Sequence, residues 1–93
     1  MDLNNIPDAL TLPLRLKLLC ALVDGQKSFG ELKELVKATD GNISVQLSKL
    51  EEWGYIASQK AFVGKRPKST YELTPFGLGQ LEEYVAFLRT IVG

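Results

Sequence analysis

The stretch that decides the fold is residues 39–56, which read TDGNISVQLSKLEEWGYI. Thr39 is a residue type that caps helices, Gly54 is one that ends them, and Ile43, Leu47 and Leu50 between them follow i, i+4, i+7 spacing. This pattern predicts a helix with one buried face. The side chains on the opposite side and its flanks, which are free to contact another molecule, are Asn42, Ser44, Val45, Gln46, Ser48 and Lys49.

A second helix precedes this one across a tight turn. Ser28 and Glu31 stand three residues apart, as a capping box requires, and the apolar face that follows runs to about Val36. Lys37 and Ala38 then form the turn. Two short helices joined in this way are typical of a helix-turn-helix, in which the second helix is the candidate reader of DNA.

Another helix is expected nearer the start of the chain. Leucines recur at helical spacing from Leu12 to Val23, with Thr11 as the expected cap and Gly25 as the stop. Because these apolar residues cover more than one face, the helix is expected to be buried on two sides.

The segment after Gly54 changes to strand-forming residues. Residues 55–58 and 69–73 are predicted strands, and the glycine and proline between them indicate a hairpin. A very short third strand is expected around Ser28 and Phe29. The hairpin carries positive charge without a single acidic residue from position 60 to 68, and its basic residues are Lys60, Lys65, Arg66 and Lys68.

The last predicted helix spans residues 74–92. Thr74 and Pro75 form a favoured helix start, and the residues that follow show the apolar spacing of coiled-coil a and d positions. A domain of 93 residues cannot bury both of its wide-striped terminal helices, so this helix is expected to pair two subunits. The predicted homodimer interface consists of Leu81, Tyr84, Val85, Leu88 and Ile91.

Composition removes several classes of function. The chain has no histidine, and its one cysteine, Cys20, cannot form an internal disulfide, so neither a metal site nor a cofactor is expected. A Ser-His or Cys-His catalytic pair is impossible, and no phosphate-binding glycine motif occurs, so the chain is not expected to be an enzyme. The absence of a signal sequence or a long apolar run favours a cytoplasmic protein.

Charge narrows the mode of binding. Eleven basic residues balance eleven acidic ones, so any contact with nucleic acid must be local. The polar face of the reading helix suits a major groove, although small polar residues also simply solvate an exposed helix. The cationic hairpin suits a phosphate backbone or minor groove, although lysines also keep a turn soluble.

Two segments of the sequence resemble a known family. They are residues 40–56 and residues 65–77, the second of which reads KRPKSTYELTPFG. The combination of Thr-Asp-Gly-Asn, Leu-Glu-x-x-Gly-Tyr and Leu-Thr-Pro-x-Gly is similar to small archaeal and bacterial winged helix-turn-helix transcriptional regulators related to the MarR, ArsR and PadR groups. The likeness runs from about Leu14 to the last helix.

The resemblance implies DNA contacts in two places. The recognition helix would contact DNA through Ser44, Val45, Gln46 and Lys49, and the wing would contact the backbone through Lys65, Arg66 and Lys68. Many relatives have histidine where this chain has Gln46, which leaves open whether this position meets a phosphate or a base. The clusters that metal-sensing relatives use are absent, so metal sensing is not carried over.

The sequence therefore predicts a mainly α (α+β) fold: one winged helix-turn-helix domain over residues 1–93, with a three-helix core, a two-stranded wing and a long C-terminal helix. The predicted function is sequence-specific binding of double-stranded DNA by a homodimeric transcriptional regulator. A winged-helix protein-interaction module that never touches DNA is the alternative. Binding of a small-molecule effector is left open. Its cavity would lie between the dimer helices and would be lined by Leu14, Leu18, Tyr84 and Phe87.

Overall fold

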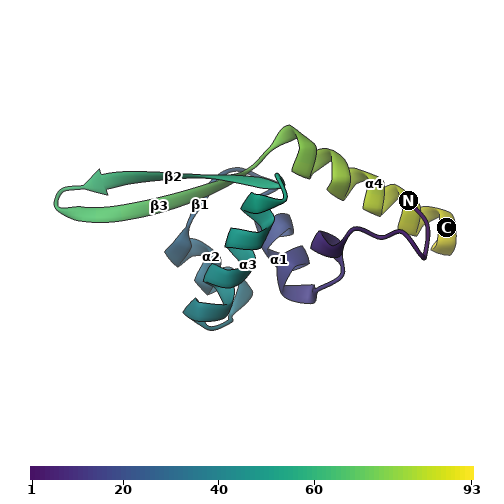
Figure 1. Cartoon of the computed structure of the whole chain (residues 1–93), viewed down its shortest axis with the longest axis horizontal. Helices are drawn as coiled ribbons and strands as arrows, with labels where there is room; N and C mark the ends of the chain where they lie inside the picture. The colour runs from purple at the N-terminus through teal and green to yellow at the C-terminus, as the bar shows by residue number, and fades with distance from the viewer.

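The chain folds into a body of helices from which a β-hairpin and a long helix extend in opposite directions (Figure 1). The computed structural model describes residues 1–93 and measures 49 × 25 × 22 Å. This is the predicted winged helix, mainly helical with a small antiparallel sheet. In chain order the elements are η1 (Asp8–Leu10), α1 (Pro13–Ala21), β1 (Lys27–Ser28), α2 (Phe29–Val36), α3 (Asp40–Glu52), β2 (Ile56–Val63), β3 (Arg66–Leu73) and α4 (Pro75–Val92).

The core lies where α1, α2 and α3 meet. Leu18, Leu32 and Ile43 are fully buried, one from each helix. Helix α1 starts later than expected, because Pro13 occupies its first turn and Leu12 stands at the cap position. The prediction that Thr11 caps α1 is wrong: its hydroxyl donates to the carbonyl of Asp8 at 2.9 Å and closes η1 instead.

The helix-turn-helix forms as predicted, from local signals. The Ser28 hydroxyl accepts from the Glu31 N–H, and the Glu31 carboxylate accepts from the Ser28 N–H, which completes the capping box. Lys37 makes the turn with a left-handed φ of 52°, and Thr39 caps α3 by accepting from the N–H of Asn42. The two helices are therefore held in register by their own ends.

The sheet has the order β1-β3-β2, with both pairs antiparallel. Its two long strands pair up to Val63 and Arg66, so the wing extends beyond the predicted strands at 55–58 and 69–73. The turn needs only two residues, Gly64 and Lys65, because Gly64 adopts a φ of 65° that costs glycine little. Sequence reasoning assigned too much of this polar stretch to the hairpin tip.

The end of α3 and the start of α4 are joined at one tight junction. The Thr74 hydroxyl donates to the carbonyl of Gly54 at 2.6 Å and accepts from the Gly77 N–H, while the Thr74 N–H donates to the Tyr55 carbonyl at 3.0 Å. A Cβ on Gly77 would overlap the backbone of Tyr55. The Leu-Glu-x-x-Gly-Tyr and Leu-Thr-Pro-x-Gly motifs, separate in the sequence, thus form a single contact.

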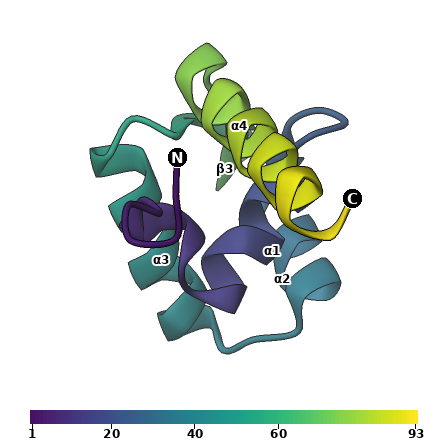
Figure 2. The same cartoon turned by 90° about the vertical axis from the view of Figure 1, so that its right-hand side faces the viewer.

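Helix α4 belongs to the body for only part of its length: it extends past the other helices (Figure 1), and its C-terminal end faces the viewer in Figure 2. Leu81 is 7% exposed and part of the core, and Tyr84 packs against the same core, so the prediction that Leu81 lies in a subunit interface is wrong. Heptad spacing identifies an apolar stripe but not what covers it. By contrast, Val85, Leu88 and Ile91 are 44%, 40% and 53% exposed.

Candidate nucleic-acid interface

One side of α3 is open to solvent along its length. The buried row of Ile43, Leu47 and Leu50 fixes this orientation, because side chains three and four residues apart share a face. Val45 is 51% exposed, which is high for an apolar side chain in a helix that packs in the core. Five of the six predicted reading residues are exposed: Asn42, Ser44, Val45, Ser48 and Lys49.

The sixth, Gln46, is not available on this surface. Its side chain is 8% exposed, and its Oε1 accepts from Nε of Arg15 at 2.8 Å. Its Nε2 donates to Oδ1 of Asn42 at 3.2 Å. The expectation that Gln46 lies open at the flank of the reading face is therefore wrong, because Arg15 of α1 draws the amide inward.

Arg15 is a site residue that sequence reasoning missed. Besides Gln46, its guanidinium donates to the carbonyl of Asp8 at 2.9 Å and lies 4.9 Å from the ring centroid of Trp53. A cation this close to an indole face is attracted by the ring. Arg15 is 31 residues from Gln46, so helical spacing gives no sign of the pair, whereas the i, i+4 pair of Asn42 and Gln46 is a signal that was available.

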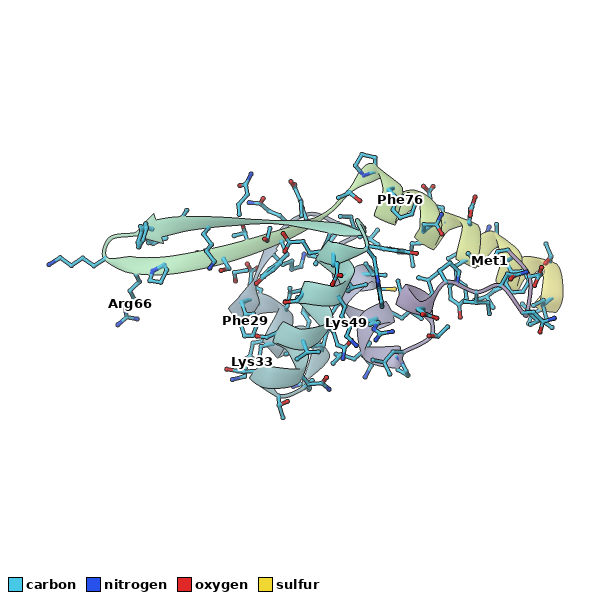
Figure 3. The ribbon with its side chains drawn as sticks, in the orientation of Figure 1. Met1, Phe29, Lys33, Lys49, Arg66 and Phe76 are labelled. Carbon is cyan, nitrogen blue, oxygen red and sulfur yellow. The ribbon has the colours of Figure 1, made fainter.

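The basic residues of the wing are divided between its two faces. Because side chains alternate along a strand, Arg66 and Lys68 share one face, Lys60 points to the other, and Lys65 is in the turn. Arg66 extends toward the side of the sheet on which α2 and α3 lie (Figure 3). Lys68 is on that side too, because it lies two residues from Arg66 on the same strand. The structure thus brings two of the four predicted cations to the α3 side.

Acidic groups near α3 are largely engaged. Asp40 pairs with Lys33 of α2 at 2.8 Å, a contact that raises the pKa of the lysine, and the Glu51 carboxylate accepts from the Ser58 hydroxyl at 2.9 Å. Both pairs tie α3 to its neighbours in the fold. The positive charge of Lys33 also offsets the negative charge of Asp40 at the N-terminal end of α3.

Of the four residues expected to line an effector cavity, three lie in or against the core and the fourth lies at the surface. Leu18 is fully buried in the core, and Leu14 and Tyr84 pack against that core. Phe87 instead lines a surface pocket with Met1 and Thr90. No cluster of three metal-ligating side chains occurs, and no helix is both long and apolar enough to cross a bilayer.

Comparisons with known proteins agree with this geometry. Residues 14–92 match a family model described as a winged helix DNA-binding domain. An uncharacterised protein of Methanocaldococcus jannaschii is 35% identical over 74 residues, which are 77% of this chain and 79% of that protein.

Two solved structures extend the likeness. A transcriptional regulator homologue from Pyrococcus horikoshii has a TM-score of 0.81 at 24% identity, covering 89% of this chain and 83% of that one. The transcriptional repressor BigR from Xylella fastidiosa has a TM-score of 0.73 at 31% identity, covering 89% of this chain and 78% of that one. The chain therefore belongs to the winged helix DNA-binding domain family, a family and fold of transcriptional regulators rather than of enzymes.

Proposed function

We propose that this protein binds specific sequences of double-stranded DNA as a homodimer in the cytoplasm and regulates transcription there. In each subunit α3 would enter the major groove, and its exposed residues would face the base edges. The wing would hold the phosphate backbone or enter the minor groove through Lys65, Arg66 and Lys68. The observation that carries this proposal is that Arg66 and Lys68 lie on the same side of the sheet as α3.

The second copy in the dimer would pack on the uncovered face of α4. Val85, Leu88 and Ile91 form part of this face, and Val23 and Leu78 continue it at a pocket beside the body. Exposed apolar surface of this extent on a small domain is typical of an interface. A two-fold axis at α4 would place two copies of α3 on one duplex, which multiplies contacts and fixes the half-site spacing.

The test measures binding to duplexes selected from a random pool, at salt concentrations from 50 to 200 mM. Three wing cations from each of two subunits would neutralise about six phosphates, which predicts a loss of affinity of roughly 10³-fold over this range. Selected sequences should share two half-sites. Affinity that stays constant across the salt range would contradict the proposal and favour a protein-interaction module instead.

A further inference from the structure

A chain of hydrogen bonds links α1 to the exposed side of α3. It runs from Nε of Arg15 to Oε1 of Gln46 at 2.8 Å, and from Nε2 of Gln46 to Oδ1 of Asn42 at 3.2 Å. Gln46, in the middle, is 8% exposed, whereas Asn42 is exposed. This series of hydrogen bonds therefore begins at the guanidinium of Arg15 and ends at Asn42, on the side of α3 that faces away from the core.

The direction of this chain is fixed by chemistry. A guanidinium only donates hydrogen bonds, so the atom of Gln46 that faces Arg15 must be the carbonyl oxygen. The NH2 group of Gln46 then faces Asn42, and only the oxygen of Asn42 can accept from it. Asparagine and glutamine amides are ambiguous in isolation, but a donor-only group at one end removes the ambiguity for both.

Asn42 consequently has two free donors, while one lone pair of its oxygen is already engaged by Gln46. The two Nδ2 protons bond to no other group of the protein. The backbone N–H of Asn42 is held by the Thr39 hydroxyl, so the residue is fixed at both its main chain and its side chain. A free asparagine presents a donor and an acceptor and can exchange them by rotation, whereas this one cannot do so without breaking the chain.

Arg15 is itself held by contacts on other sides. It donates to the carbonyl of Asp8 at 2.9 Å and lies over Trp53, which follows directly after α3. Rotating Arg15 away would leave Gln46 largely buried with an unpaired oxygen, at a free-energy cost. The arrangement thus resists a flip of either amide.

We propose that Arg15 acts as a positioning residue that makes Asn42 selective for a hydrogen-bond acceptor on a base edge. This inference rests on the proposed binding of DNA by α3 and names the chemistry that one position reads. In the major groove the acceptors are N7 of purines, O6 of guanine and O4 of thymine, whereas the amino groups of adenine and cytosine are donors and would be disfavoured opposite the Asn42 Nδ2 group. Gln46 supports the reading without touching DNA.

The test compares two substitutions of Gln46. In Gln46→Glu the side chain still accepts from Arg15 but cannot donate to Asn42, so the Asn42 amide is free to turn. In Gln46→Met both bonds are lost with no change of charge. Gln26→Glu, in the exposed loop before β1, adds the same charge outside α3 and serves as the control.

Duplexes are selected from a random pool with each variant. Both Gln46 variants should lose about 5- to 10-fold of the preference at one base pair per half-site, in line with the discrimination expected of a good base contact. The Gln26→Glu control should keep that preference. Retention of the full preference by both Gln46 variants would overturn the inference, as would an equal loss of affinity for all duplexes, which would indicate that Asn42 meets a phosphate.

A second measurement needs no DNA. Exchange of the Arg15 Nε proton with solvent, followed by NMR in the native protein, should be roughly tenfold slower or more than exchange of the Arg66 Nε proton on the exposed wing. The protection should persist in Gln46→Glu and be lost in Gln46→Met. Equal exchange rates for the Nε protons of Arg15 and Arg66 would show that the hydrogen bond from Arg15 to Gln46 does not form. A protected Arg15 in a protein that binds no duplex would instead refute the proposed function and, with it, the reading role of Asn42.

Discussion

Helix α3 and the wing are the two parts of the proposed DNA interface, and they are supported in opposite ways. Helix α3 has Ile43, Leu47 and Leu50 in the core, and this buried row holds its exposed residues in place. The wing is exposed at every position from Ser58 to Lys68, and beyond the hydrogen bond from Ser58 to Glu51 it is held by its own strand pairing. Contacts that read base edges need side chains on a rigid support, whereas contacts to phosphate need only a positive charge nearby.

The largest expected difference between the two regions is in stability. Leu50→Ala should lower the free energy of unfolding by about 2–5 kcal/mol, because it removes a fully buried side chain and leaves a cavity. Phe62→Ala, on the wing, should change it by no more than about 0.5 kcal/mol, since Phe62 is 75% exposed. Urea denaturation measures both. Similar losses for the two variants would mean that the wing is packed as tightly as α3.

Separating the subunits should affect DNA binding next most strongly. Leu88→Asp places a charge on the uncovered face of α4 and should yield a monomer in analytical ultracentrifugation. Its affinity for a two-half-site duplex should fall by roughly 10²-fold or more, because one reading helix then acts without the other. Leu35→Asp, at an exposed leucine of α2, is the control and should remain a dimer. A dimeric Leu88→Asp variant would rule out the proposed interface.

Within the wing, the two faces should differ. Arg66→Ala should weaken binding to every duplex by about the same factor, on the order of tenfold, and reduce the salt slope by about 1.8 per dimer. Lys60→Ala, on the opposite face of the hairpin, should change the slope much less. Titrations at several salt concentrations give both slopes. If Arg66→Ala altered the sequence preference instead, the wing would be reading bases.

The smallest effect concerns the cap that aligns α2 before α3. The hydrogen bonds from Ser28 lower the pKa of Glu31, so its contribution to stability is present above the unfolded value near 4.5 and is lost as the pH falls through the folded value. Glu31→Gln should therefore be slightly less stable than the native protein at neutral pH, and the difference should shrink in acid. Glu34→Gln, exposed in the same helix, is the control. A difference that is constant with pH would contradict the role of the charged cap.

Features that depend on neighbouring residues were predictable from the sequence. The caps at Ser28, Thr39 and Thr74 are set by side chains within three residues of their partners, and all three are confirmed. Apolar spacing also gave the buried row of α3. These signals are local, so one sequence contains them in full.

Features that depend on distant segments were not predictable. Arg15 meets Gln46 only because α1 packs beside α3, and nothing in the spacing of the two residues indicates that contact. Leu81 looked like an interface residue because periodicity shows which residues share a face but not whether that face meets the same subunit or another. The length of the wing strands was underestimated because their charged residues favour a loop when each is considered alone. In the structure, the hydrogen-bonded ladder between the two strands holds them as strand.

The junction at Gly77 has a mechanical consequence. Because the backbone of α4 lies directly against that of Tyr55, with Thr74 hydrogen-bonded across, we expect α4 and the end of α3 to move together as one unit. Helix α4 has 18 residues and is about 27 Å long, so a tilt of this whole unit by about 10° displaces the far end of α4 by about 5 Å. In the proposed dimer the same geometry works in reverse: a small rotation between two α4 helices changes the distance between the two copies of α3. Even the methyl group of alanine at position 77 would push the start of α4 away from Tyr55 and so change the direction of α4.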